Sequence, residues 1–204
     1  MFRGHHATCT AICSSNGDQY LCTGSQDTKI KLWDQRQVTC AATFREHRGA
    51  INCLRMSPDG RWVASGSADG TLKIWDVTAD KVLANFEVPD QAVTTLEFNP
   101  QNLALANGSS DRTVKYWDLE SMKSINQTGP DTGTISHLSF SELNAEHLFA
   151  ASQQNIRVWN IENNLQLDCL SVPPKEITDM KICYKRRFLL LSTIQNNTLS
   201  VYYN

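Results

Sequence analysis

The sequence predicts an all-β fold made from one unit of short antiparallel strands that is repeated along the chain. The first observation is a fixed period: Trp33, Trp75, Trp117 and Trp159 are each 42 residues apart, and Tyr202 follows after 43. The second is that apolar residues alternate with polar ones between turns that contain Gly and Asp, which is typical of consecutive hairpins. We therefore expect five repeats, each ending near one of these aromatic residues.

The second repeat, residues 47–76, shows the pattern most clearly, with the sequence HRGAINCLRMSPDGRWVASGSADGTLKIWD. Its apolar alternation over 51–56 predicts a first strand, and the turn Ser-Pro-Asp-Gly follows at 57–60. A second strand is expected over 61–65 and, after an Asp-Gly turn, a third over 71–75.

The first repeat follows the same plan, with strands expected over 11–13, 20–25, 29–33 and 39–44. Apolar alternation continues into the last repeat, so all repeats are expected to form a single domain over residues 1–204.

Composition excludes several classes of function. Of the 204 residues, 41% are hydrophobic and 20% charged, as in an ordinary globular protein. The net charge of −2 provides no basic field for nucleic acid or for an anionic membrane surface. There is no run of 18 apolar residues, and the start MFRGHHATCT has no apolar signal core. We therefore expect a cytoplasmic protein with no nucleic-acid or membrane partner.

The cysteines are odd in number, scattered, and contain no Cys-x-x-Cys pair; they are Cys9, Cys13, Cys22, Cys40, Cys53, Cys169 and Cys183. Cys9, Cys22 and Cys53 fall on strand positions that hold small apolar residues in neighbouring repeats. We expect these three to behave as small buried hydrophobic residues in a reducing compartment.

The 42-residue period, the short strands and the closing Trp-Asp at 33–34, 75–76 and 117–118 resemble the WD40 repeat, which builds one blade of a β-propeller. The resemblance implies a WD40 propeller with five blade-repeats. Such propellers usually have seven blades, which need roughly 290 residues. The chain therefore either closes with five blades or is an incomplete seven-blade ring.

In WD40 blades a His, a Ser or Thr on the second strand, a turn Asp and the third-strand Trp form a buried hydrogen-bonded set. By spacing, the first two repeats carry complete sets, namely His5, Thr23, Asp27 and Trp33, and His47, Ser65, Asp69 and Trp75. The third repeat has Pro89 and Asn107 at the first two positions and keeps Asp111 and Trp117. The fourth keeps only Trp159, so we expect the late repeats to fold through packing and to have lower local stability.

His, Ser and Asp are also the members of a hydrolytic triad. Here the set recurs with a Trp in successive repeats and has no oxyanion device beside it, which favours a structural network. No nucleotide-binding Gly-Lys-Ser/Thr loop is present. A metal site drawn from the N-terminal ligand types is disfavoured because the repeat pattern already uses His5, His6, Cys9 and Cys13. We expect no catalytic residues, cofactor, metal or small-molecule substrate.

Three runs, GSQDTKIKLWDQR, ASGSADGTLKIWDVTADKVL and GSSDRTVKYWDLE, occur in an order that resembles the WD40 domain of the regulatory, non-catalytic subunit of katanin, the microtubule-severing complex. The similarity extends to the last repeat, KEITDMKICYKRRFLLL, and covers the last five of that domain's seven blades, which favours the incomplete ring. It implies a scaffold that binds the katanin ATPase complex, microtubules or spindle-pole proteins and locates to the cytoskeleton and the centrosome. We expect no C-terminal helical domain of the kind that binds the ATPase.

A second resemblance lies in the run Trp33-Asp34-Gln35-Arg36, which is similar to the motif by which WD40 substrate receptors dock on the adaptor of cullin-4 ubiquitin ligases. It implies that Arg36 contacts the adaptor. The alternative interpretation is a strand end followed by a solvated Arg. A WD40 adaptor in another assembly, such as one for RNA processing, is the remaining alternative.

Propellers usually bind partners through loops at one rim. The candidates in the expected loops are Gln26, Lys29, Asp90 and Arg112. A basic run in the last repeat is either a solvated turn or a site for an acidic partner, and it consists of Lys185, Arg186 and Arg187.

Overall fold

The computed structural model describes residues 4–15, 17, 19–88, 91–141, 145–153, 155–171, 177–183, 188–193 and 199–203. Within the last three strands, the described side chain is that of Met180.

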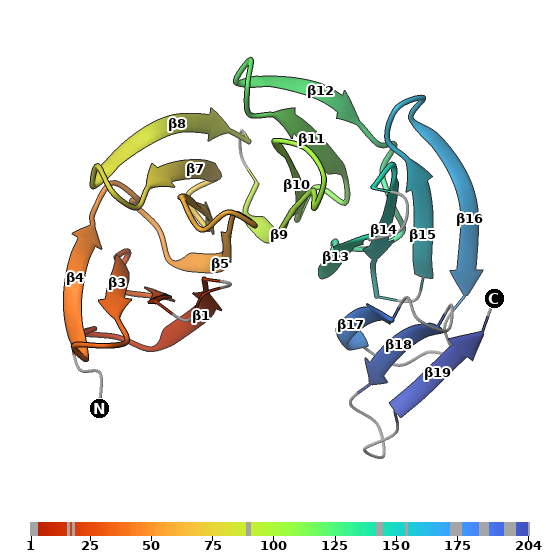
Figure 1. Cartoon of the computed structure of the whole chain (residues 1–204). Helices are drawn as coiled ribbons and strands as arrows, with labels where there is room; N and C mark the ends of the chain where they lie inside the picture. The colour runs from red at the N-terminus through yellow and green to blue at the C-terminus, as the bar shows by residue number, and fades with distance from the viewer. Residues whose placement is uncertain are drawn as a thin grey trace. The chain divides into compact units, whose positions relative to one another are not determined.

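The described chain is built from β-strands joined by turns (Figure 1). The first sixteen strands are β1 (Cys9–Ser14), β2 (Tyr20–Ser25), β3 (Ile30–Asp34), β4 (Thr39–Phe44), β5 (Ile51–Met56), β6 (Trp62–Ser67), β7 (Thr71–Asp76), β8 (Lys81–Glu87), β9 (Val93–Phe98), β10 (Ala104–Ser109), β11 (Val114–Asp118), β12 (Lys123–Gln127), β13 (His137–Phe140), β14 (His147–Ala151), β15 (Asn155–Asn160) and β16 (Leu165–Ser171). The last three are β17 (Ile177–Cys183), β18 (Phe188–Thr193) and β19 (Leu199–Tyr203).

Four of the sheets have four antiparallel strands each, in the orders β1-β2-β3-β4, β5-β6-β7-β8, β9-β10-β11-β12 and β13-β14-β15-β16. This arrangement confirms the all-β fold of propeller blades. The expected five blades are corrected to four, because the last sheet has three strands, β17-β18-β19.

Strand limits agree with the sequence at 20–25, 39–44 and 51–56 and differ elsewhere. The second strand of the second repeat was expected over 61–65, but β6 continues to Ser67 because Gly66 pairs with Leu72 and Ser67 with Ile51. A bulge between Ile51 and Cys53 leaves Asn52 without a partner in the β6 ladder. Its side-chain amide instead donates to the carbonyl of Val93 at 2.9 Å.

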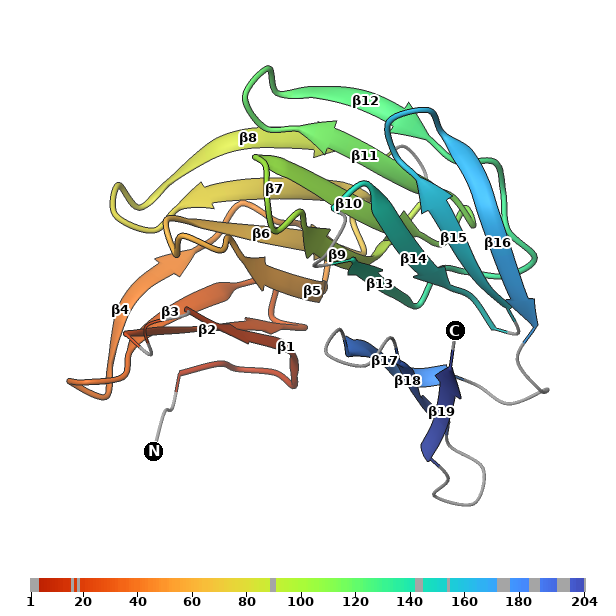
Figure 2. The ribbon, with the colours of Figure 1, turned by 45° about the vertical axis from the view of Figure 1, so that its right-hand side comes forward.

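The chain divides into two compact units, Met1–Phe98 and Asn99–Asn204. In the first unit, the sheet β1–β4 packs against the sheet β5–β8 (Figure 2). The core between them contains Cys22, Ile30, Leu32 and Phe44 from the first sheet and Ile51, Leu54, Val63 and Trp75 from the second. The Phe44 and Trp75 ring centroids are 4.8 Å apart.

Two glycines allow the sheets of the first unit to approach closely. A Cβ atom on Gly24 of β2 would lie 2.5 Å from Cγ2 of Ile51, and one on Gly66 of β6 would lie 2.4 Å from Cγ1 of Val93. Both distances are far shorter than a normal carbon contact of about 3.5–4.0 Å. Each glycine therefore makes room for the first strand of the next sheet.

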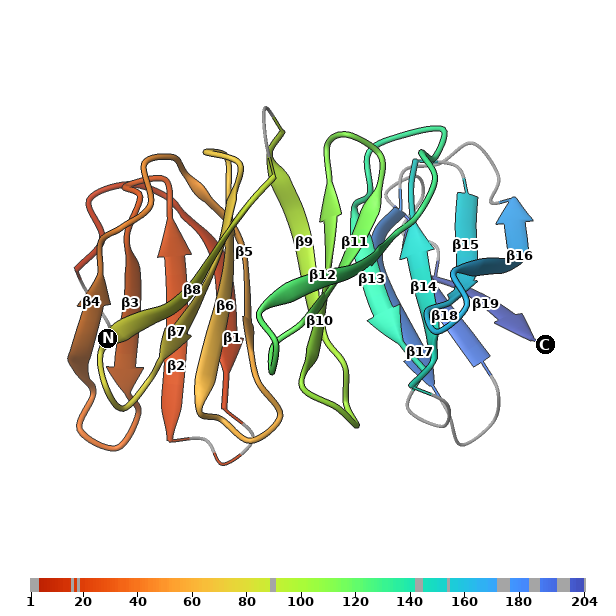
Figure 3. The ribbon, with the colours of Figure 1, turned by 90° about the horizontal axis from the view of Figure 1, so that it is seen from above.

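In the second unit, β13–β16 form a sheet that runs in chain order (Figure 3). Its core partners on β10 and β11 include Ala104, Ala106, Val114 and Tyr116, and its own members include Ile135, Leu138, Phe140, Leu148 and Ala150. The Tyr116 and Phe140 ring centroids lie 6.1 Å apart. An apolar face on alternate strand residues thus forms the core, as the period-2 pattern requires.

The outer face of β1 is not covered by described residues. Ile12 is 63% exposed, whereas Leu54 and Leu96, which stand 42 and 84 residues later, are 1% and 0% exposed. Cys9 on the same strand is also exposed, which corrects the expectation that it is buried. Cys22 and Cys53 are buried, because other sheet residues cover their positions.

Each of the first four repeats has a left-handed residue in the turn between its third and fourth strands. These residues are Val38, Asp80, Met122 and Asn164, with φ values of 56°, 51°, 54° and 53°. They are spaced by 42 residues and none is a glycine. A side chain at the end of the third strand stabilises this turn. In the second repeat, Oδ1 of Asp76 accepts the backbone N–H groups of Thr78 and Ala79 at 2.8 and 2.9 Å.

Candidate functional site

The polar set of the second repeat lies in the interior between β6, β7 and the loop before β5. The indole N–H of Trp75 donates to Ser65 Oγ at 2.8 Å, and Ser65 Oγ lies 2.7 Å from His47 Nε2. His47 Nδ1 is 3.2 Å from Asp69 Oδ2 and 2.9 Å from Thr71 Oγ1. A neutral His47 with its proton on Nδ1 satisfies every one of these contacts, because Nε2 then accepts from the Ser65 hydroxyl.

The first repeat has the same arrangement. His5 Nδ1 lies 3.0 Å from Asp27 Oδ2 and its Nε2 lies 2.8 Å from Thr23 Oγ1. The Trp33 indole N–H donates to Thr23 Oγ1 at 2.8 Å. Asp27 also accepts the backbone N–H of His6 at 2.9 Å, so its carboxylate ties the loop before β1 to the turn after β2.

These contacts shift the pKa values of the buried groups. Burial raises the pKa of Asp27, but hydrogen bonds from the His6 N–H, from His5 and from the Lys29 N–H outweigh it and lower the pKa to about 2. The Asp69 pKa is lowered in the same way, since hydrogen bonds from Thr71 and Arg48 exceed the effect of burial. Both carboxylates are therefore ionised at neutral pH.

For His47, burial lowers the pKa below its usual value, and the neighbouring Asp69 only partly opposes this effect. The imidazole is therefore neutral at pH 7, in agreement with the tautomer that its neighbours require.

In the third repeat, a shorter set is present on β10 and β11. The Trp117 indole N–H donates to Asn107 Oδ1 at 2.7 Å, so the Asn107 amide takes the place of the hydroxyl. Asp111 Oδ1 accepts the backbone N–H and the hydroxyl of Thr113 at 2.8 and 2.7 Å. The position of Pro89 lies outside the described residues.

The fourth repeat replaces the set by an ion pair that sequence reasoning missed. Arg157 Nε on β15 lies 3.3 Å from Asp131 Oδ2, with side-chain exposures of 19% and 3%. Asp131 stands 84 residues after His47, and Arg157 stands 84 residues after Lys73. Alignment of the repeats at their common period could have found this exchange, because an acid replaces the His while a Lys or Arg recurs at the third-strand position in every one of the first four repeats.

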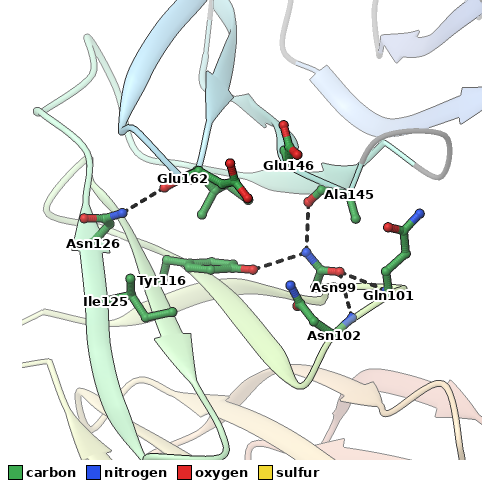
Figure 4. A pocket seen from close by; sticks show the side chains of 10 residues that line it. Asn99, Gln101, Asn102, Tyr116, Ile125, Asn126, Ala145, Glu146 and Glu162 are labelled. Carbon is green, nitrogen blue, oxygen red and sulfur yellow. Dashed lines mark hydrogen bonds between the residues drawn. The ribbon is translucent and has the colours of Figure 1, made fainter.

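A cleft of about 350 Å³ opens in the second unit (Figure 4). Its wall is formed by the turn between β9 and β10, by strands β11 and β12, and by the turns that precede β14 and β16. The lining residues are Asn99, Gln101, Asn102, Tyr116, Ile125, Asn126, Ala145, Glu146, Ile161 and Glu162. No motif in the sequence predicts this cleft.

Hydrogen bonds from Asn99 organise the cleft. Its side-chain amide donates to Tyr116 Oη at 3.1 Å and to the carbonyl of Ala145 at 2.9 Å. Its Oδ1 accepts the backbone N–H groups of Gln101 and Asn102 at 2.9 and 3.2 Å. Figure 4 shows Asn99 and Tyr116 in the middle of the cleft, with the two glutamates along one side.

A comparison with family models gives a match to the WD domain, G-beta repeat, over residues 1–34, 38–76 and 80–118. The chain belongs to the WD40 repeat family. Each matched segment ends at the Asp of the Trp-Asp dipeptide of a repeat. A comparison with curated proteins finds no match to the chain.

The polar sets of this WD40 chain are built for structure. Ser65 is 0% exposed and its Oγ is held between Trp75 and His47, so no substrate reaches it as a nucleophile. Over the described ranges, no group of three or more His, Cys, Asp or Glu residues is arranged to hold a metal. In the part of the chain that is described, no helix is long and apolar enough to cross a membrane. WD40 domains are usually non-catalytic scaffolds that bind proteins.

The candidate partner-binding residues of the WD40 loops occupy separate turns. Gln26 and Lys29 lie in the turn between β2 and β3, where Gln26 is exposed and Lys29 half-buried. Arg112 is exposed between β10 and β11 with φ of 70°, and its carbonyl accepts the N–H of Asp131 at 2.7 Å. The remaining loop candidates, Asp90, Lys185, Arg186 and Arg187, lie outside the described residues.

Arg36 lies exposed in the turn between β3 and β4 of the first WD40 repeat. Asp34 Oδ1 accepts the backbone N–H groups of Arg36 at 2.8 Å and of Gln37 at 3.2 Å. The Asp34 side chain is thus occupied by the turn.

Proposed function

We propose that this WD40 chain is a non-enzymatic scaffold that acts in microtubule severing and in the organisation of microtubules and spindle poles by binding other proteins. The observation that carries the proposal is the ordered resemblance of GSQDTKIKLWDQR, ASGSADGTLKIWDVTADKVL and GSSDRTVKYWDLE to the katanin regulatory subunit. Single WD40 repeats resemble one another broadly, whereas the order of several distinguishes families.

Residues 1–204 are, in this proposal, one WD40 domain that forms part of a seven-blade ring. The exposure of Ile12, at 63% against 1% for Leu54 at the same position of the next repeat, supports it. A strand face that carries a large apolar residue such as Ile12 is normally covered by a neighbouring blade.

Localisation and sedimentation test the function. The tagged chain is expressed in dividing cells, and the purified chain is sedimented with microtubules, alone and with the katanin ATPase subunit. We expect enrichment at spindle poles and sedimentation with microtubules in at least one of the two mixtures. A diffuse distribution together with a chain that stays in the supernatant of both mixtures would overturn the proposal.

A second candidate function, substrate receptor of a cullin-4 ubiquitin ligase, is favoured by the exposed Arg36. The equivalent positions of the next three repeats hold Thr78, Glu120 and Glu162, so the basic side chain is particular to the first. We expect the ligase adaptor to be captured by the wild-type chain and not by Arg36→Ala. Arg112→Ala, which removes an exposed Arg from another turn, is the matched control. Equal capture by all three chains, or capture by none, would remove this candidate.

A further inference from the structure

We propose that the cleft lined by Asn99, Tyr116, Glu146 and Glu162 binds a basic side chain, lysine or arginine, of a protein partner. The proposal rests on the function of the chain as a protein-binding scaffold and adds to it the site and the chemistry of one contact. It requires no particular partner and no microtubule role.

The size and shape of the cleft fit a side chain with its flanking backbone. Its volume of about 350 Å³ falls in the range of about 300–1,000 Å³ that is usual for ligand pockets. The walls come from turns and strands of neighbouring repeats, so the cleft is a depression between blades. Its lining combines the apolar residues Ile125, Ala145 and Ile161 with polar and acidic residues.

Charge selects a cation. Two of the ten lining residues, Glu146 and Glu162, are acidic, and none is Lys or Arg. Both glutamates are exposed, and Figure 4 shows their carboxylates along the same side of the cleft. A concave surface lined by one sign of charge concentrates ions of the opposite sign and repels acidic groups.

The polar groups in the middle of the cleft already have hydrogen-bond partners within the protein, so a ligand is recognised by the residues at the edge. The buried Asn99 uses both of its amide donors on Tyr116 and Ala145 and its oxygen on two backbone N–H groups. Asn126 similarly donates to the carbonyl of Ile161 at 2.8 Å. Because these amides already hold the walls together, a ligand meets a formed surface and does not have to order it.

Exposed apolar residues in the lining and on the strand after Glu162 indicate that the cation belongs to a peptide. Ile125 lines the cleft and is half exposed, so it can contact the methylene stem of a lysine or arginine. Leu165 and Leu167 are also exposed and follow Glu162 closely on β16. The Asn164 side chain, which donates to the Gln127 carbonyl at 3.0 Å, ties that turn to β12. A basic residue followed by an apolar one matches the order in which Glu162 and the exposed leucines follow one another along the chain.

Binding of capped six-residue peptides to the full chain tests the proposal. The peptides differ at one position, which is arginine, lysine, glutamine or glutamate, and this position is followed by leucine. NMR of the labelled protein reports binding through the side-chain amide signals of Asn99 and Asn126. We expect the arginine and lysine peptides to shift these signals and the glutamine and glutamate peptides to leave them in place.

Variants assign the binding to the cleft. The double variant Glu146→Gln/Glu162→Gln is expected to weaken the arginine peptide by about fivefold, the effect of losing two exposed ion pairs. Glu120→Gln removes the same charge from the same turn position one repeat before Glu162, outside the cleft, and is expected to bind like wild type. Ile125→Lys places a cation at the cleft and is expected to prevent binding. The spectra of all variants also report whether the fold is retained.

Equal shifts by the glutamine peptide, or undiminished binding by the double variant, would overturn the cleft proposal. That result would leave a positive spindle-pole or microtubule assay standing. Conversely, arginine-peptide binding in a chain that stays diffuse in cells and in the supernatant of both microtubule mixtures would sustain the cleft and reject the microtubule role.

Discussion

Asp131 and Arg157 form an ion pair in the fourth repeat, with Asp131 buried and Arg157 partly buried, at the two positions that His47 and Lys73 occupy in the second. The Arg157 Nε lies 3.3 Å from Asp131 Oδ2, and in the second repeat Lys73 Nζ lies 3.9 Å from Glu46, the residue next to His47. A cation on the third strand thus faces an acid near the loop before the first strand in both repeats. In the fourth repeat this pair connects the loop to the sheet after the His network has been lost.

Removing one member of this ion pair should lower the free energy of unfolding more than replacing both members. Arg157→Leu leaves the Asp131 carboxylate, 3% exposed, without its counter-charge, and we expect it to lower the free energy of unfolding by about 3 kcal/mol. The double variant Asp131→Leu/Arg157→Leu should cost less than that single change. Urea unfolding of the full chain measures both. Lys115→Leu, at the same strand position one repeat earlier, is the control, and costs that simply add would disprove coupling.

Removal of the Ser65 hydroxyl should destabilise the second repeat. Ser65→Ala leaves the Trp75 indole N–H and the His47 Nε2 without their shared partner in a buried site, at a cost of about 1–3 kcal/mol. Thermal unfolding measures the change. Ser121→Ala removes an exposed hydroxyl that contacts Asp118 and should stay within about 0.5 kcal/mol of wild type. Equal effects of the two changes would mean that the buried network contributes nothing to stability.

Stability should fall as the pH drops below about 6.5, the ordinary pKa of a histidine. Burial lowers the pKa of His47 in the folded chain, so the unfolded chain binds the proton more readily and protonation favours unfolding. The stabilisation is complete above the unfolded pKa and is lost as the pH falls toward the folded value. His47→Gln should flatten this part of the curve, measured by urea unfolding between pH 5 and 8. A variant curve as steep as that of wild type would argue against His47 as the cause.

Val38 should be a site where a substitution stabilises the chain. It is a β-branched residue with φ of 56°, and this left-handed conformation costs roughly 1–2 kcal/mol for such residues. We expect Val38→Asn to raise the free energy of unfolding by about 1 kcal/mol, because asparagine tolerates this conformation. Asp80→Val, at the equivalent turn with φ of 51°, should lower it by a similar amount. Changes of the same sign at both turns would show that backbone strain is not the cause.

The sequence predicts the repeat unit well because its period is marked by side chains that cannot easily be exchanged. A Trp on the third strand and Gly or Asp in the turns fix the register, and β2 and β4 begin and end at the predicted residues. Cys9 shows the limit of this reasoning. It has the strand position of the buried Ile51, but its exposure depends on whether another sheet covers the first strand, and the repeat pattern contains no information on that.

The cleft and the ion pair could not be predicted in the same way. The lining of the cleft comes from turn and strand residues more than 60 positions apart, such as Asn99 and Glu162, and each is an ordinary residue for its place. In the sequence, Asp131 indicates only that a histidine has been lost from the repeat. The ion pair becomes evident from the structure, where Arg157 of β15 lies beside Asp131. Similarly, no glycine marks the left-handed turns in the sequence. Their backbone N–H groups are instead held by the side-chain oxygens of Asp34, Asp76, Asp118 and Asn160 at the ends of the third strands.

The two glycines at the sheet contacts make neighbouring repeats dependent on each other in one direction along the chain. A side chain added at Gly24 would displace Ile51, a residue of the following repeat, and one added at Gly66 would displace Val93. The damage from such a change would therefore extend one repeat downstream of the mutation. An entire repeat can be duplicated or deleted while these contacts are preserved, whereas a single methyl group cannot be inserted. Change by whole units is thus the easier evolutionary path for this architecture.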